Sequence, residues 1–187
     1  MESVIVSYNS GPSIILHDFF ESCADDIKQK CVDCGHKYTS VCPPYLNHKN
    51  VIEAMEDNTI CFIAAHGTDD AILNEAEEEI LSNRTANYAL EGKVFYSVSC
   101  LCGMNLGPEL KRIGVSLFVG YKDKFKVGTN DELFKLAAIS GLNSILEGDS
   151  TEEAKKKMYD CYDTCIDSAD FWDGAFLLHD RDCLVFE

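Results

Sequence analysis

Three apolar runs constrain the fold of this chain more than any other feature. They are TICFIAA at residues 59–65, KVFYSVS at 93–99 and VSLFVGY at 115–121. Runs of this kind, rich in β-branched and aromatic side chains, are typical of central strands in a sheet that is covered on both faces. Helical spacing of apolar residues marks a segment between the second and third runs, and similar segments occur elsewhere in the chain. The sequence therefore predicts an α/β protein with a mainly parallel sheet.

The remaining segments continue this alternation of strands and helices. Shorter strands are predicted at residues 3–8 and 37–41. Helices are predicted from residue 18, around residues 51–55, from 106 to 113, from 131 to about 147 and from 151 to 167. Asn130 is a candidate N-cap, and Ser150 with Glu153 resembles a capping box. The apolar segments at 175–180 and 183–187 predict a terminal hairpin or a pair of edge strands.

Length and composition favour a single domain. The chain has 187 residues, of which 46% are hydrophobic, and it shows neither an internal repeat nor a linker. That is enough for one substantial core and short for two. We therefore expect one domain spanning residues 1–187, built as a three-layer α/β/α sandwich.

Charge limits the classes of partner. The chain carries 32 Asp and Glu against 16 Lys and Arg, a formal net charge of -16. Such a surface repels phosphate backbones and anionic lipid, so neither nucleic acid nor a membrane is an expected partner, whereas a basic protein segment would be attracted. The N-terminal MESVIVSYNS lacks the pattern of a secretory signal, and a cytoplasmic protein with ten reduced cysteines is expected.

Two of the buried runs end next to a reactive side chain. His66 and Gly67 follow the first run, while Cys100 follows the second and Gly103 comes three residues later. In an open α/β sheet, functional groups gather beyond the carboxyl ends of the central strands. A nearby imidazole can accept the proton of a thiol, and glycine lets the backbone approach a substrate closely. If the two runs form neighbouring strands, their ends meet and predict a Cys-His site at one edge of the sheet.

These motifs resemble those of the caspase-like cysteine peptidases of clan CD. The pattern is a strand ending in His-Gly, a strand ending in Ser-x-Ser-Cys-x-x-Gly, and a strand ending in Gly-Tyr, spread over residues 59–121. Within the clan, it is most similar to the bacterial branch called CHAT proteases. The resemblance implies a mainly parallel sheet between helices, and a cysteine endopeptidase that cleaves a protein substrate without a cofactor or metal.

The same resemblance implies roles for individual residues. Cys100 would be the nucleophile and His66 the general base, and the N–H groups of Gly67 and Cys100 would form the oxyanion hole. The loop after the third strand helps to build the S1 pocket in relatives. Asp123 is therefore a candidate for binding Lys or Arg at P1, with Asp131 as a weaker one. A bacterial defence or cell-death pathway, with an activator or sensor protein, is the implied setting.

The sequence also departs from the family pattern. The Gln-Ala-Cys signature of animal caspases is absent, and the interval from His66 to Cys100 is shorter than the caspase value of about 50 residues. An Asp-cleaving caspase is therefore not expected. Cys102 is a second candidate nucleophile, although Cys100 is favoured because it directly ends the strand.

Other interpretations of the same residues stay open. The chain could be a catalytically inactive module of this fold that binds a partner through its acidic surface, or a thiol redox protein that uses Cys100 and Cys102, or Cys31 and Cys34. A zinc site is a weaker alternative, because only one Cys-x-x-Cys is present. Its candidate ligands are Cys31, Cys34, His36 and Cys42. Asp69 and Asp70, which follow His-Gly, are expected to be solvated loop carboxylates.

Overall fold

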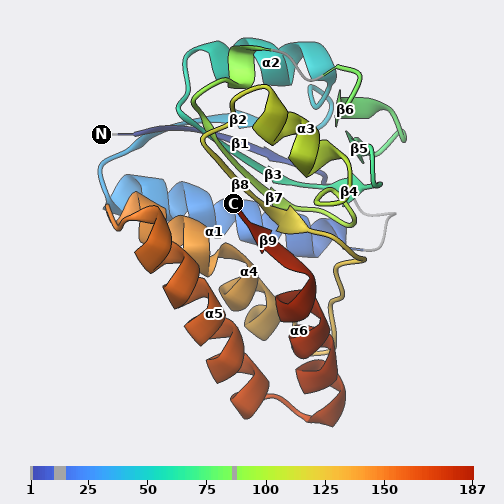
Figure 1. Ribbon diagram of the computed structural model, residues 1–187, viewed down its shortest axis with the longest axis vertical. Coiled ribbons are helices and arrows are strands. Elements are labelled where there is room, and N and C mark those ends of the chain that lie inside the picture. The colour runs from blue at the N-terminus through green and yellow to red at the C-terminus, as the bar shows by residue number, and fades with distance from the viewer. Residues whose placement is uncertain (1, 11–15, 86–87) are drawn as a thin grey trace.

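The centre of the protein is a six-stranded sheet with the strand order β2-β1-β3-β7-β8-β9 (Figure 1). The computed structural model describes residues 2–10, 16–85 and 88–187. The first five strands in this order pair in parallel, and only the last pair, β8 with β9, is antiparallel. The strands are β1 (Ser3–Tyr8), β2 (Lys37–Val41), β3 (Ile60–Ala64), β7 (Val94–Val98), β8 (Leu117–Tyr121) and β9 (Leu184–Phe186).

Helices cover both faces of this sheet, as Figure 1 shows. One face carries the longer helices α1 (His17–Asp33), α4 (Asp131–Leu146), α5 (Thr151–Ser168) and α6 (Phe171–Cys183). The other carries α2 (His48–Glu56) and α3 (Leu106–Arg112). The predicted three-layer α/β/α sandwich with a mainly parallel sheet is confirmed. No helix in the described part of the chain combines the length and apolar character needed to cross a membrane.

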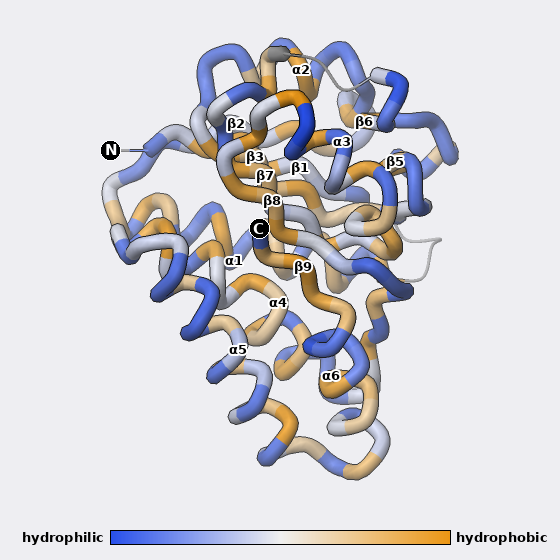
Figure 2. The backbone as a smooth tube through the Cα atoms, in the orientation of Figure 1, coloured by the Kyte–Doolittle hydropathy of each residue, from blue (hydrophilic) through white to orange (hydrophobic). Residues whose placement is uncertain are grey.

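Alternating side chains of each strand build two separate cores. In β3, Phe62 and Ala64 face the layer of α1 and α4, whereas Cys61 and Ile63 face the layer of α2 and α3. The other central strands alternate in the same way, because successive side chains of a strand point to opposite faces. Figure 2 shows the apolar residues concentrated along these central strands. Burial on both faces is the reason that the sequence of these strands reads as continuously apolar.

A small antiparallel sheet follows β3. It consists of β4 (His66–Gly67), β5 (Ala71–Leu73) and β6 (Glu79–Ser82), in that order. The acidic turn between β5 and β6 is organised by Asn74, whose side chain accepts hydrogen bonds from the N–H groups of Ala76 and Glu78. This sheet fixes the direction in which the chain leaves β3, and with it the position of His66.

Two helix caps were predicted from the sequence, and the structure contains one of them. The Ser150 hydroxyl accepts from the N–H of Glu153, and the Glu153 side chain returns to the backbone of Ser150, so the predicted capping box is confirmed. Asn130 occupies the N-cap position of α4, but its side chain makes no capping bond. The carboxylate of Asp173, from α6, accepts a hydrogen bond from the Asn130 N–H instead.

The C-terminal region corrects the sequence interpretation. The segment at 175–180, predicted as a strand, lies within α6, and only the last three residues before Glu187 form an edge strand. Asp170 starts the helix by accepting from the N–H groups of Trp172 and Asp173. A short apolar run does not distinguish a strand from a helix by periodicity alone. The residue that caps this helix, Asp170, lies five residues before the apolar run at 175–180, so the run itself contains no helix start signal.

Candidate active site at the ends of β3 and β7

The ends of β3 and β7 lie side by side, as the sequence predicted. The two strands pair in parallel with Ala64 beside Val98, and the N–H of Ala65 donates to the carbonyl of Val98 at 3.3 Å. His66 and Cys100 each follow two residues after this pair. Their parent strands place both residues on the sheet face that α1 covers, because side chains two positions apart point to the same face.

Gly67 lies against the backbone of Cys100. A Cβ built on Gly67 would lie 2.4 Å from the carbonyl oxygen of Cys100 and 3.3 Å from its nitrogen. No side chain fits at the first of these distances, so this close approach of the two chains requires glycine. The two N–H groups assigned to the oxyanion hole by the family resemblance therefore belong to segments in direct contact.

The imidazole of His66 is held by α1. Its ring centroid lies 5.6 Å from that of His17 and 5.4 Å from that of Phe20, which meets it edge-on. Burial lowers the pKa of His66, and the nearby His17 lowers it further, while Glu77 acts in the opposite direction. Its Nε2 is buried and has no hydrogen-bond partner among the described residues. A neutral imidazole of this kind is suited to accepting a proton near pH 7.

The thiol of Cys100 is half-buried beneath the segment that follows β8. Its Sγ lies 3.8 Å from the carbonyl oxygen of Phe125, to which the thiol can donate. Burial raises the pKa of Cys100, and the carboxylate of Asp180 adds to this effect. No hydrogen bond joins Cys100 to His66 in the described part of the chain. In this conformation the pair is therefore a neutral thiol and a neutral imidazole.

Cys102 has a different environment from Cys100. It is fully buried on the opposite side of the sheet, in the core with α2 and α3, and its Sγ donates to the carbonyl of Ser99 at 3.4 Å. Burial raises its pKa to about 11. A Cβ on Gly120 would lie only 2.8 Å from this sulfur, so the thiol fills a space with no room for a substrate. Geometry therefore favours Cys100 over Cys102 as a nucleophile.

Asp123 lies in the loop after β8, which is close in space to the Cys100 segment. Its carbonyl accepts from the N–H of Leu101 at 3.0 Å, which ties this loop to the nucleophile turn. Its carboxylate is exposed, accepts from the N–H of Lys124 and lies 4.0 Å from the Nε2 of His179. The role of Asp123 at P1 stays a prediction. Asp131 is an exposed residue in the first turn of α4.

Asp69 and Asp70 contribute to the entry of α3. The carbonyl of Asp69 accepts from the N–H groups of Asn105 and Leu106, and the Asn105 side chain donates to both carboxylates. Asp70 also accepts from the Asn83 side chain at 2.8 Å. These contacts give the two aspartates a structural role in joining the His66 loop to the helix after Cys100.

The four candidate zinc ligands are not gathered into one cluster among the described residues. Cys31 is buried in the core beneath α1, whereas Cys34 lies at the end of that helix. One ring nitrogen of His36 accepts from a backbone N–H, and the other lies 2.7 Å from a backbone carbonyl. All ten cysteines of the chain are free thiols.

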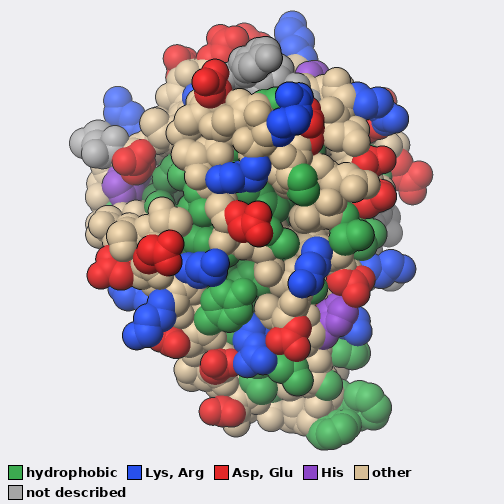
Figure 3. All heavy atoms as spheres, in the orientation of Figure 1, with side chains coloured by type: hydrophobic (Ala, Val, Ile, Leu, Met, Phe, Trp, Pro, Cys, Tyr) green, Lys and Arg blue, Asp and Glu red, His purple; other side chains and the backbone are tan. Residues whose placement is uncertain are grey.

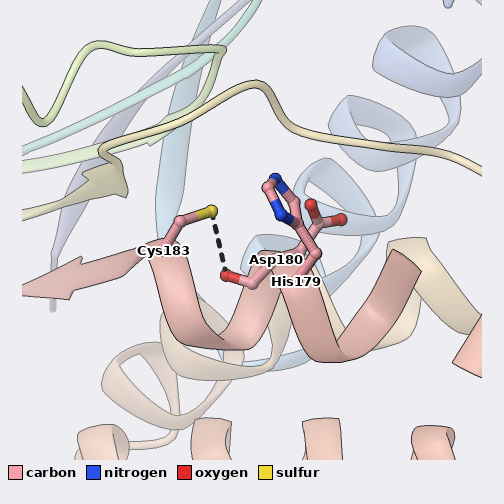
Figure 4. Close-up of side chains that lie close together, drawn as sticks. All are labelled: His179, Asp180 and Cys183. Carbon is pink, nitrogen blue, oxygen red and sulfur yellow. Dashed lines mark hydrogen bonds between the residues drawn. The ribbon is translucent and has the colours of Figure 1, made fainter. Parts of the chain in front are cut away.

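A side-chain cluster that the sequence did not indicate lies on α6. It contains His179, Asp180 and Cys183, whose potential ligand atoms lie within 4.8 Å of one another (Figure 4). The sequence predicted His179 and Asp180 on opposite faces of one strand and Cys183 in the next, so it gave no reason to group them. His179 Nε2 lies 3.1 Å from the carbonyl of Lys124, and Asp180 Oδ1 accepts from the N–H of Lys126. These atoms bind the segment after β8, so we assign no metal to them.

Asp180 is the most perturbed carboxyl group near Cys100. It is fully buried, and its second oxygen, Oδ2, has no hydrogen-bond partner among the described residues. Burial raises its pKa to about 8, although the backbone and side chain of Lys126 act in the opposite direction. A carboxyl group in this position holds its proton at neutral pH. It is one of the residues near Cys100 that the sequence did not indicate.

The fold is similar to that of gingipain R in two solved structures. A crystal structure of gingipain R, described as an Arg-specific cysteine proteinase, matches 98% of this chain with a TM-score of 0.65 and 15% sequence identity. A complex of the pro- and mature domains from Porphyromonas gingivalis matches 96% with a TM-score of 0.66 and 13% identity. This likeness shows that the chain has the caspase-like fold.

This chain is much shorter than these structural neighbours. It covers 46% of the gingipain R chain and 45% of the chain in the complex. No protein-family model matches the sequence, and no curated protein sequence matches it either. The comparisons therefore bear on the architecture, and the chemistry depends on the residues described above.

We expect Asp180→Asn to change how stability depends on pH. Because the pKa of Asp180 is about 8 in the folded protein against an ordinary value of 3.8, the folded state retains a proton that the unfolded state releases between these values. Stability therefore decreases with rising pH, by at most about 1.4 kcal/mol per pH unit from this group. Urea unfolding between pH 4 and pH 8 should show the variant gaining stability relative to the wild type.

Asp167→Asn, at an exposed position on α5, is the matched control and should keep a constant difference from the wild type. Parallel curves for Asp180→Asn and the wild type across this range would contradict the raised pKa.

Proposed function

We propose that this protein is a cysteine endopeptidase that hydrolyses peptide bonds in a protein substrate. The observation that carries the proposal is the juxtaposition of the β3 and β7 ends, with Gly67 packed directly against the backbone of Cys100. This is where a Cys-His site would be expected in a caspase-like sheet. The gingipain fold supports a cysteine peptidase, and the His-Gly and Cys-x-x-Gly motifs support the CHAT branch in particular.

In the proposed mechanism, the Cys100 sulfur attacks the scissile carbonyl carbon while His66 accepts the thiol proton. The N–H groups of Gly67 and Cys100 donate to the oxyanion that forms. When the C–N bond breaks, His66 delivers the proton to the departing amine, leaving a thioester on Cys100. Water, deprotonated by His66, then hydrolyses the thioester and regenerates the thiol. Asp123 is proposed to pair with a Lys or Arg side chain at P1.

An activator or sensor protein is part of the proposal. Cys100 and His66 are both neutral here and are not bonded to each other, so the reactive thiolate-imidazolium pair has still to form. One of the gingipain structures is a complex of pro- and mature domains, which supports protein-protein contacts as a means of control in this fold. We place the enzyme in the cytoplasm, in a bacterial defence or cell-death pathway, on the basis of its motifs and its ten free thiols.

The neutral state of the pair also supports a second function. In a catalytically inactive module, Cys100 would be an ordinary half-buried thiol, and the net charge of -16 would attract a basic partner. The two functions differ in whether His66 influences the reactivity of Cys100.

Cleavage of a peptide library should require Cys100. We expect products from the wild type and from Cys102→Ala, because Cys102 is buried in the opposite core, and none from Cys100→Ala. Mass spectrometry of every product would identify the bonds cleaved and the P1 residue. Cleavage by Cys100→Ala would exclude the proposed nucleophile. Absence of cleavage by any variant would require the reactivity test below to separate an inactive module from a missing activator.

The reactivity test measures alkylation of Cys100 by iodoacetamide at pH 7. We expect His66→Ala to slow this reaction about tenfold, because the imidazole no longer accepts the thiol proton. His48→Ala, on α2 in the opposite helix layer, is the control and should leave the rate unchanged. Because the two side chains are not hydrogen-bonded in this conformation, the comparison is repeated in Gly128→Ala, which displaces the segment over Cys100, and equal rates with and without His66 in that background would favour the inactive module.

Asp123→Ala should reduce cleavage after Lys and Arg about tenfold or more, because a charge-assisted bond to P1 is removed. Cleavage after uncharged residues should change little. Asp167→Ala, which removes an exposed carboxylate on α5, is the matched control, and Asp131→Ala tests the weaker P1 candidate. If Asp123→Ala retains full activity on basic P1 peptides, Asp123 does not select them.

A further inference from the structure

The segment that follows β8 covers the candidate nucleophile. Residues 122–130, here called the strap, leave the sheet after Tyr121 and pass across the end of β7. The Phe125 carbonyl lies 3.8 Å from the sulfur of Cys100. The Phe125 ring is buried, with its centroid 4.8 Å from that of Tyr121 and 5.7 Å from that of Phe19. The strap is therefore anchored in the core directly above the thiol.

Helix α6 holds the first half of the strap. His179 Nε2 lies 3.1 Å from the Lys124 carbonyl, and the Lys126 N–H donates to Asp180 Oδ1 at 3.0 Å. These two bonds flank Phe125, whose carbonyl faces Cys100. Figure 4 shows His179 and Asp180 on α6, and the chain that leaves β8 passes close to them.

The second half of the strap is held by Asp173. Its Oδ1 accepts from the Thr129 N–H at 3.0 Å, and its Oδ2 accepts from the Asn130 N–H at 2.9 Å and from the Thr129 hydroxyl at 3.1 Å. A Cβ on Gly128 would lie 1.8 Å from the same Oδ1, so the strap approaches the carboxylate as closely as a residue without a side chain permits.

The buried face of α6 is unusual in its composition. Its four buried residues are Asp173, Leu177, Asp180 and Cys183, so two of the four are carboxyl groups. A helix of a globular protein normally directs apolar residues to its core face. Asp173 and Asp180 lie seven residues apart, which places them on the same side of the helix, and both hold backbone N–H groups of the strap. This face of α6 therefore binds the strap through its two carboxyl groups, while Leu177 and Cys183 pack into the core.

The same helix presents an exposed apolar end. Phe171 and Trp172, immediately before Asp173, are 80% and 69% exposed, and their rings pack edge to face. Figure 3 shows a hydrophobic projection at this end of the molecule. Helix α6 packs against α5 and continues directly into β9, so it is fixed to the sheet, and the strap is the part that can move away from it.

We propose that α6 is a latch that holds the strap over Cys100, so that this conformation is a resting state, and that separation of the strap from Asp173 and Asp180 frees the thiol. Calling it a resting enzyme rests on the proposed function. The masking of Cys100 does not depend on it, because thiol reactivity can be measured without a substrate.

Alkylation of individual cysteines tests the latch. Asp173→Ala removes three bonds to the strap, whereas Gly128→Ala displaces the strap from its own side and leaves α6 intact. We expect each variant to raise the rate of alkylation of Cys100 by N-ethylmaleimide about tenfold, because the freed thiol is less buried and more often ionised. Asp167→Ala, an exposed carboxylate on α5, is the matched control and should react like the wild type.

Other cysteines provide internal references in the same mass spectra. Cys34, remote from the strap, should react equally in all variants, and the fully buried Cys61 should stay unmodified. If Asp173→Ala exposes Cys61 to alkylation, unfolding explains the result for that variant, and the rate measured for Gly128→Ala then tests the proposal.

Hydrogen exchange tests the latch in the wild type. The latch requires amide hydrogens of Lys126, Thr129 and Asn130 to exchange faster than those of β8. Slow exchange there, or unchanged Cys100 rates in the folded variants, would overturn the proposal.

Peptide cleavage by the same variants separates this inference from the proposed function. Faster alkylation together with faster cleavage supports both. Faster alkylation without cleavage keeps the latch and counts against the peptidase. Unchanged alkylation with cleavage already present in the wild type would make the strap a permanent wall of the substrate cleft and exclude the latch.

Discussion

The parallel pairing of β3 with β7 is the interaction on which the candidate site depends. The register that places Ala64 beside Val98 also brings the two strand ends together, and the small sheet after β3 then fixes the direction of the chain at His66. A shift of one residue in this register would turn one of the two side chains to the opposite core. The hydrogen bond from Ala65 to Val98 continues this pairing beyond β3, and the glycine at 67 lets the two chains stay close as they leave the sheet.

The two helix layers give Cys100 and Cys102, the two cysteines of the turn after β7, different environments. Cys100 lies at the edge of the core under α1 and the strap, whereas Cys102 is enclosed between the sheet and the helices of the opposite layer. Desolvation raises the pKa of both thiols, but only Cys100 lies beneath the strap. The difference arises from strand alternation and not from the identity of the side chain.

Helix α6 connects the C-terminal region with the site. It carries buried carboxyl groups where other helices of this protein carry apolar residues, and these groups organise the strap above Cys100. Burying an unpaired carboxylate is unfavourable, and Asp180 avoids that cost by retaining its proton. Stability near neutral pH is thereby reduced in exchange for a defined conformation of the strap.

The sequence by itself determined the class of fold, the positions of the central strands along the chain and the two residues at their ends. These follow from local patterns: apolar runs for covered strands, helical spacing between them, and His-Gly and Cys at their ends. The capping box of α5 was equally local. By contrast, α6, the partners of His66 and the choice between Cys100 and Cys102 depended on tertiary structure. Each is set by contacts between segments far apart in the chain, such as Asp173 with Asn130, which no local period encodes.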